Sequence, residues 1–433
     1  MPLSNCRRVS QLTLVTSCLL LVSACDWQEV FGGGADDAPE PSVIPSSQPS
    51  LILSPTPEPT PTPVVDFGSV VKGVGDWQMP KLDWPLNGTG IIQCSGQRGQ
   101  QIPCGTLPDR DQQDARVGRD AAARLKNLPK KGEGPSSFDF TKLDKNGTEL
   151  IWNDLDHRCV RDNITGLVWD VQTAQLPHAE LANHRRSVNS ERACGFNDWR
   201  VPSRLELHSL LDYGQTETKL NSVYFPGFIR AWYWSSSNAD ALSAWAVDFG
   251  EGRVFNFVTT NERSQRRLLL VRGGAECGNV STSCTGSMRA VRVADVAAKD
   301  DKVVFTKPGL VFQRCPVGMS WESNTCTGEP SLFSWYEAVR PAWPEGWRVP
   351  NAKELSLLLR ENTLPRIHTS WFPYFSGHDL PSTQLWSATL NQRTLEASDE
   401  ELQAFYQDMA SGDLNFGPAL DKKLIILVKD SAE

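Results

Sequence analysis

Two distant segments of the chain share a run that begins with tryptophan and arginine. Trp199-Arg200-Val201-Pro202 recurs as Trp347-Arg348-Val349-Pro350. Other short motifs keep the same order around each run: Gly166-Leu167-Val168 and Gly309-Leu310-Val311, Phe225-Pro226 and Phe372-Pro373, and Trp234-Ser235 and Trp386-Ser387. The spacing between these motifs changes only slightly, as expected for two copies of one domain whose loops differ in length. The sequence therefore predicts a duplicated domain and not a solenoid of short repeats.

Each of the two runs leads into a predicted helix. Ser203 and Asn351 are favourable N-cap residues, and Glu206 and Glu354 follow three positions later, where a carboxylate can reach back to the amide of the cap. Leucines recur after each cap at the spacing of one helix face. We expect the tryptophan that opens each run to be a core residue beside this helix, rather than a residue that stacks on a ligand.

After each helix, the hydrophobic pattern changes to a period of two. Residues 244–249 alternate, a glycine-rich turn follows, and residues 253–258 are predicted to form the returning strand of a hairpin. Residues 404–409 and 413–416 repeat this pattern after the second run. We expect a further strand to close each copy, at 288–293 and at 424–429. This order predicts an α+β fold in which an early helix precedes short, mostly antiparallel strands.

The first 25 residues indicate export. Arg7 and Arg8 precede a mostly apolar run over residues 12–22, which has the length of a signal peptide and is too short to span a bilayer. The run ends in Val22-Ser23-Ala24-Cys25, which resembles the bacterial lipobox. We predict that residues 1–24 are removed and that Cys25 carries the lipid. The alternative is an ordinary cleavage site beside an incidental cysteine.

The rest of the chain divides by composition. Residues 39–63 contain nine prolines among Ser, Thr and Glu, which favours an extended and disordered stalk over 25–77. We assign 78–144 to an extension that packs on the first domain, although an independent small module is an alternative. The two domains are predicted at 145–296 and 302–430, and we call these ranges the first and second segments.

Eight cysteines follow the stalk, and their even number suits an oxidising compartment. Their grouping along the chain predicts four local disulfides: Cys94–Cys104, Cys159–Cys194, Cys277–Cys284 and Cys315–Cys326. A metal cluster or redox pair is the alternative, but the sequence contains no Cys-x-x-Cys and its six histidines are not interleaved with the cysteines.

The composition narrows the classes of function. The net charge of −8 disfavours nucleic-acid binding, and no later apolar stretch is long enough for a multi-pass membrane protein. No combination of nucleophile, base and orienting group is evident, so we predict neither enzymatic activity nor a cofactor or metal site.

Several motifs, taken together, resemble one known family. In the first segment they are Asp162-Asn163-Ile164-Thr165-Gly166-Leu167-Val168-Trp169, Asp198-Trp199-Arg200-Val201-Pro202, Tyr233-Trp234-Ser235 and Val291-Arg292. In the second they include Gly309-Leu310-Val311-Phe312, Cys326-Thr327-Gly328, Gly346-Trp347-Arg348 and Leu385-Trp386-Ser387. This combination resembles the Lcl C-terminal domain family, long known only as a domain of unknown function. The resemblance implies a C-type-lectin-like fold for both copies, of which the second is the more degenerate.

The resemblance also implies a ligand. In that family a collagen-like surface adhesin binds sulfated glycosaminoglycans through this domain, which implies glycan binding or adhesion here. A net charge of −8 opposes a polyanion unless a local patch exceeds it. The sequence offers such a patch at Arg263, Arg266, Arg267 and Arg272, to which Arg289 and Arg292 add. The alternative is that these arginines lie on a solvated loop.

These observations predict an exported bacterial lipoprotein that faces the periplasm or the cell surface. Its lipid anchor binds the membrane, and its two domains bind a glycan or an envelope protein. A purely structural role in the envelope or in a surface appendage, with no sugar ligand, is the alternative. A less favoured alternative is an enzyme, because formylglycine-generating enzymes have a distantly similar fold.

Overall fold

The computed structural model describes residues 86–431, except 97–98, 109, 262, 274–295, 342, 345, 378–381 and 396–401. All of them belong to one unit, Val71–Glu433. Several sequence predictions lie outside the described residues: the signal peptide, Cys25, the stalk, the expected strand at 288–293, Cys277–Cys284, Arg289 and Arg292.

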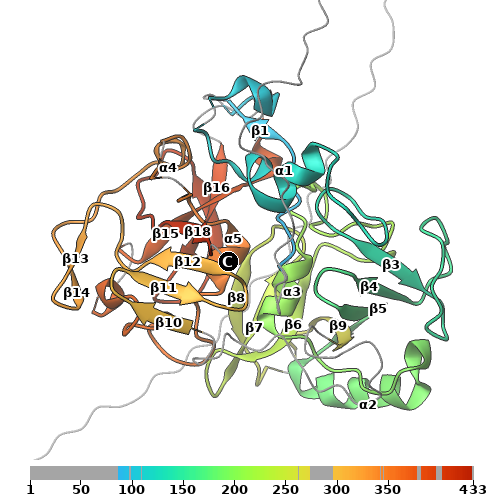
Figure 1. Cartoon of the computed structure of the whole chain (residues 1–433). Coiled ribbons are helices and arrows are strands. Elements are labelled where there is room, and N and C mark those ends of the chain that lie inside the picture. Colours follow the sequence, from blue (N-terminus) through green and yellow to red (C-terminus); the bar gives the residue numbers. More distant parts are fainter. Residues whose placement is uncertain are drawn as a thin grey trace, which may run out of the picture. The chain divides into compact units, whose positions relative to one another are not determined.

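The largest sheet runs through both segments (Figure 1). Among the described residues it has ten strands, in the order β15-β16-β17-β8-β7-β6-β9-β5-β4-β3. Neighbouring strands are antiparallel, except for β6 and β9, which are parallel. One register pair, Leu414 with Val254, joins β17 to β8 and so joins the two segments. The strands are β3 (Phe140–Leu143), β4 (Cys159–Asp162), β5 (Leu167–Leu176), β6 (Trp232–Asn238), β7 (Ser243–Asp248), β8 (Val254–Val258), β9 (Arg266–Gly273), β15 (Gln384–Leu390), β16 (Gln403–Asp408) and β17 (Leu414–Pro418).

Smaller sheets and short helices complete the described fold. A four-stranded sheet has the order β10-β11-β12-β18, and β1-β2 and β13-β14 are hairpins. Their bounds are β1 (Cys94–Ser95), β2 (Gln101–Ile102), β10 (Val296–Lys299), β11 (Lys302–Phe305), β12 (Leu310–Gln313), β13 (Ser320–Glu322), β14 (Thr325–Thr327) and β18 (Val428–Asp430). The α-helices are α1 (Gly118–Arg124), α2 (Leu181–Glu191), α3 (Arg204–Leu210), α4 (Trp335–Val339) and α5 (Ala352–Ser356). This composition confirms the predicted α+β class. Within the described part of the chain, every helix is too short or too polar to cross a lipid bilayer.

The capping signals at α3 and α5 are confirmed. Ser203 Oγ accepts a hydrogen bond of 3.2 Å from the Glu206 amide, and the Glu206 carboxylate accepts one of 2.8 Å from the Ser203 amide. Asn351 and Glu354 form the same reciprocal pair at 2.9 and 2.8 Å. The tryptophan that opens each run is buried, as expected of a core residue.

A backbone bridge fixes the strand that closes each segment. Arg200 exchanges two hydrogen bonds of 2.9 and 3.0 Å with Val271 in β9, and Arg348 exchanges bonds of 2.9 and 2.8 Å with Val428 in β18. In the first segment, β9 therefore makes the bridge that β18 makes in the second, whereas the strand expected at 288–293 lies outside the described residues. In the second segment, β18 is shorter than the expected range of 424–429.

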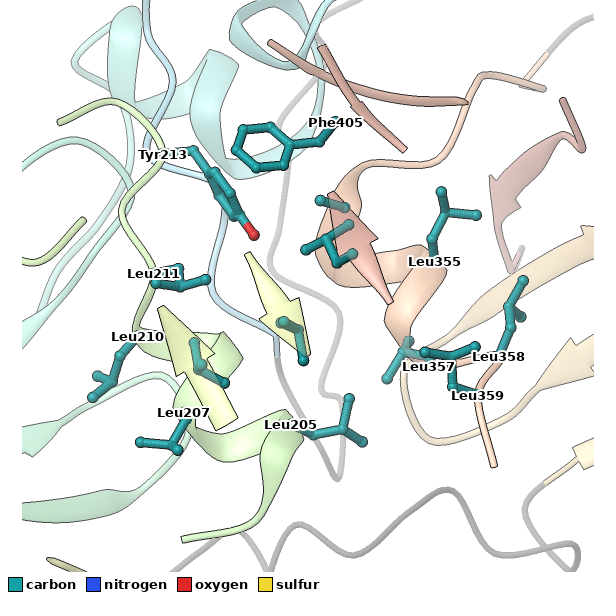
Figure 2. Close-up of a cluster of buried hydrophobic side chains, with 14 of the residues drawn as sticks. Leu205, Leu207, Leu210, Leu211, Tyr213, Leu355, Leu357, Leu358, Leu359 and Phe405 are labelled. Atoms are coloured by element: carbon teal, nitrogen blue, oxygen red, sulfur yellow. The ribbon is translucent and has the colours of Figure 1, made fainter. Parts of the chain in front are cut away.

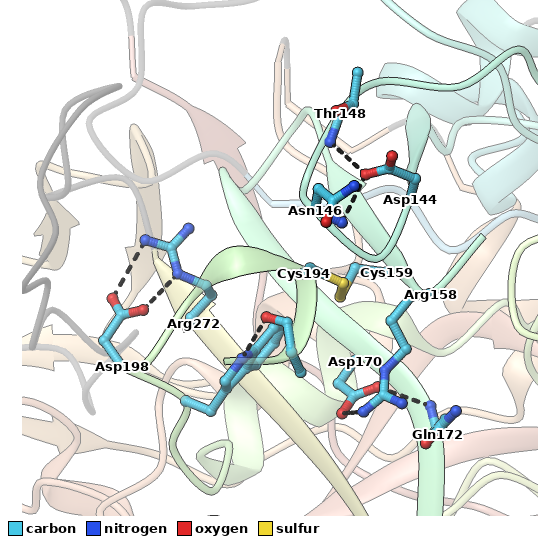
Figure 3. The surroundings of a disulfide bond; sticks show 12 residues. Asp144, Asn146, Thr148, Arg158, Cys159, Asp170, Gln172, Cys194, Asp198 and Arg272 are labelled. Atoms are coloured by element: carbon cyan, nitrogen blue, oxygen red, sulfur yellow. Dashed lines mark hydrogen bonds and ion pairs between the residues drawn. A yellow bond between two sulfur atoms is a disulfide. The ribbon is translucent and has the colours of Figure 1, made fainter. Parts of the chain in front are cut away.

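Three of the predicted disulfides are confirmed. Cys94–Cys104, Cys159–Cys194 and Cys315–Cys326 join residues that are 10, 35 and 11 positions apart. Figure 3 shows Cys159–Cys194, which ties the start of β4 to the turn after α2.

The two segments share a hydrophobic core at the helices that follow their caps. Figure 2 shows leucines from both helices in one buried cluster, with the rings of Tyr213 and Phe405 beside each other. These ring centroids are 4.8 Å apart. Two hydrogen bonds cross the same contact, from Arg204 Nη2 to the Ser356 carbonyl (3.2 Å) and from Lys353 Nζ to the Ser209 carbonyl (2.9 Å).

The extension contacts both segments, not the first alone. Asn87 Nδ2 donates to Asp162 in β4 (2.6 Å), whereas Asp114 accepts from Thr389 Oγ1 in β15 (2.8 Å). Lys353 Nζ also donates to the Gly88 carbonyl (2.7 Å). Burial raises the pKa of Asp114 to about 7 and lowers that of Lys353 to about 8, because the charged forms lose their hydration. These groups therefore hold the extension in a buried polar contact.

Candidate ligand-binding surface

Aromatic and cationic side chains gather on one face of the large sheet in the first segment. Trp232 lies in β6, Phe255 and Phe257 lie in β8, Arg266 begins β9, and Arg253 immediately precedes β8. The register of β6 and β8 on either side of β7 places the first three on the same face. All five side chains are half-buried. We call these five residues the aromatic–arginine surface.

Small residues in β7 allow the rings to meet. Ala246 lies between Trp234 and Phe255 in the register, and Ala244 lies opposite Phe257. Because alanine leaves the space above β7 open, the Trp232 ring reaches across to both phenylalanines of β8. Its centroid is 5.8 Å from that of Phe255 and 5.0 Å from that of Phe257, both in edge-to-face contact.

The two guanidinium groups lie against these rings. The Arg266 guanidinium is 3.7 Å from the Phe257 centroid and 4.5 Å from that of Trp234. The Arg253 guanidinium is 5.6 Å from Trp232 and also contacts Asp248 at 3.3 Å. Contacts of this kind hold a cation over an aromatic face.

Arg266 keeps most of its hydrogen-bonding capacity. It donates to Ser264 Oγ, and among the described residues no carboxylate pairs with it. Its Nε is buried without a partner in the same part of the chain. Burial lowers the pKa of the Arg266 guanidinium from its usual value. A guanidinium held by rings in this way can bind a carboxylate or sulfate through two parallel hydrogen bonds.

The structure brings only one of the predicted arginines onto this surface. Arg263 is exposed in the turn before β9. Arg267 alternates to the opposite face of β9, where its Nη1 lies 3.3 Å from Thr173 Oγ1. Arg272 lies at the far end of β9 and is paired with Asp198 at 2.7 Å (Figure 3). Its guanidinium is also 3.7 Å from the Phe196 ring centroid. Arg266, Arg267 and Arg272 are therefore strand residues, and not parts of one solvated loop.

Sequence reasoning missed the aromatic residues of this surface. The alternation of Phe255 and Phe257 was visible in the sequence. That Trp232 lies beside them depends on the register of β6 and β8 across β7, which the sequence does not show. In the second segment, Gln384, Asn415 and Gly417 occupy the corresponding hairpin positions. The aromatic surface therefore belongs to the first segment.

The second segment has a lysine over two aromatic rings, but not the outer aromatic residues. Lys423 Nζ lies 4.9 Å from the Trp386 centroid and 4.4 Å from that of Tyr406. Without the three outer aromatic residues, this lysine does not form an equivalent surface.

Comparison with known proteins finds one family match, which lies within the first segment. No curated protein matches the chain. The model of the Lcl C-terminal domain matches residues 158–272, which contain all five residues of the aromatic–arginine surface. A match to this family indicates a surface- or envelope-associated domain. The range 158–272 thus matches the Lcl C-terminal domain, the family that the sequence motifs indicated.

Proposed function

We propose that the chain is an envelope-anchored lipoprotein that binds a glycan through the aromatic–arginine surface, and that the glycan carries carboxylate or sulfate groups. The proposed activity is binding, and no catalytic step is assigned to it. The observation that carries the proposal is Arg266, a cation stacked on aromatic rings and not paired with a described carboxylate.

The chemistry of the surface matches such a ligand. Half-buried aromatic rings offer flat apolar area to the C–H face of a sugar ring, and guanidinium groups suit the acidic substituents. The net charge of −8 acts against a polyanion at a distance. At physiological ionic strength, however, the electrostatic repulsion from distant charges is screened within about 8 Å. The arginines of the surface therefore determine the electrostatic energy of a bound anion.

Two further observations support the wider proposal. Three formed disulfides suit an exported protein in an oxidising compartment, as the lipobox-like sequence before Cys25 also suggests. The matching caps, backbone bridges and hairpins favour the second segment as a degenerate copy of the first.

The proposal is tested with the full chain in detergent on an array of acidic and neutral glycans. We expect Arg266→Gln and Trp232→Ala to weaken binding of an acidic glycan at least tenfold, because they remove the anion donor and an apolar platform. We expect raised salt to weaken binding by the unmodified chain.

The matched controls lie outside the surface. Arg161→Gln changes a strand arginine that is paired with Glu149, and Trp152→Ala changes a tryptophan that is 58% exposed. Equal binding by all four variants would contradict the proposal. If no glycan on the array binds and the chain captures an envelope protein in a pull-down, the structural role is favoured instead.

A further inference from the structure

A groove lies in the second segment and is lined in part by Ser320 and Trp321 of β13. It holds about 580 Å³, which is within the range of small-molecule sites. Two half-exposed tryptophans, Trp321 and Trp343, line it together with Asp300, Asp301 and Gln313. Neither tryptophan has a part in the aromatic–arginine surface.

Trp321 is held by a supported cation and by a disulfide. The Arg314 guanidinium is 3.8 Å from its ring centroid. Three carbonyls accept hydrogen bonds from this arginine, those of Trp371 (2.8 Å), Asp300 (3.1 Å) and Ser370 (2.6 Å). The cross-strand partner of Trp321 is Cys326, which is bonded to Cys315. Arg314 therefore acts as a fixed support for the ring.

Trp343 is fixed from another part of the chain. Its Nε1 donates a hydrogen bond of 3.0 Å to the Ala338 carbonyl at the end of α4. Its ring also makes an edge-to-face contact with Phe333, at 5.9 Å between centroids. Two aromatic rings are thus held in place at one groove before any ligand arrives, which lowers the entropic cost of binding.

The polar groups of the groove select the ligand. The two aspartates are exposed, with Asp301 Oδ1 3.6 Å from Lys302 Nζ, and the side-chain amide of Gln313 has no hydrogen-bond partner among the described residues. The described lining contains no lysine or arginine. The carboxylates accept hydrogen bonds from hydroxyl groups and repel anions, and the amide can both donate to and accept from hydroxyl groups.

We propose that this groove binds a neutral saccharide, with sugar rings stacked on Trp321 and Trp343 and hydroxyl groups bonded to Asp301 and Gln313. This ligand differs in charge from the one proposed for the aromatic–arginine surface. The two sites therefore recognise different saccharides, and the inference does not depend on the first site.

The test is titration calorimetry of the full chain with a panel of neutral trisaccharides, namely maltotriose, cellotriose, chitotriose and mannotriose. We expect at least one to bind with little dependence on salt. Trp321→Ala and Gln313→Ala should each weaken that binding at least tenfold. Gln313→Ala leaves both tryptophan rings in place, so it tests the site even if Trp321→Ala disturbs the hairpin.

The controls separate this site from the first one. Trp232→Ala, Arg266→Gln and Trp152→Ala should bind the neutral trisaccharide as the unmodified chain does. Failure of all four trisaccharides to bind would overturn the inference, as would binding that Gln313→Ala leaves unchanged. Binding of a lysine-rich peptide that is lost in both groove variants would overturn it in favour of a peptide site.

Discussion

At the scale of single residues, one glutamate in each segment serves two purposes. Glu206 caps α3 and also accepts two hydrogen bonds from Arg200, of 2.7 and 2.6 Å. Glu354 and Arg348 repeat this contact at 2.7 and 2.6 Å. The cap could be predicted because its spacing is local. The ion pair could not be predicted, because it depends on a contact between distant residues. The backbone bridge to Val271 or Val428 directs each arginine toward its glutamate.

Glu206→Gln should lower the free energy of unfolding by about 3 kcal/mol, as expected when one partner of a buried ion pair is removed. The Glu206 side chain is fully buried, and glutamine can still bond to the cap amide. The loss therefore reports on the ion pair, and urea denaturation of the full chain measures it.

The control is Glu149→Gln, which breaks an ion pair with Arg161. The Glu149 side chain is 57% exposed, so this change should cost less than about 1 kcal/mol. Equal losses in the two variants would show that the Arg200–Glu206 pair has no special role.

At the scale of elements, local patterns predicted the hairpins and the helix starts, whereas they did not identify β9 as the strand that bridges to Arg200. Val271-Arg272 and Val291-Arg292 are the same dipeptide, and the sequence does not show which one meets Arg200. The aromatic–arginine surface was missed for a related reason. It combines β6, β8 and β9, so its geometry depends on strand register, which is a property of the sheet.

The disulfides constrain these elements unequally. Replacing both Cys159 and Cys194 by alanine should lower the free energy of unfolding by about 4 kcal/mol, and replacing Cys315 and Cys326 by about 3 kcal/mol, since the longer loop gains more entropy when it is released. The bonds span 35 and 11 residues. Urea denaturation of the oxidised variants measures both losses, and a larger loss for the shorter loop would contradict this explanation.

At the scale of the whole molecule, the largest hydrophobic cluster contains residues of both segments, beside one smaller cluster in the second segment and another within residues 143–270. The sequence predicted the duplication, and it placed leucines such as Leu207 and Leu358 on the apolar face of each helix. It did not show that they are buried in the same cluster, because a hydrophobic pattern identifies the buried face of a helix but not its partner. The shared sheet escaped prediction for the same reason.

This shared core predicts cooperative unfolding. In calorimetry, the full chain should give one main transition for residues 86–431, and Leu358→Ala, at a fully packed position, should shift the whole transition to lower temperature. Two separate transitions, with only one affected by the substitution, would show that the segments unfold independently.

The single register pair between β17 and β8 also affects which deletions such a protein can tolerate during evolution. A descendant shortened before residue 302 would keep β8 with an open edge, and open strand edges pair readily with other chains. Its α3 leucines would lose their covering at the same time. We expect deletion of residues 302–430 to cause aggregation, so this arrangement favours retention of both segments whatever each of them binds.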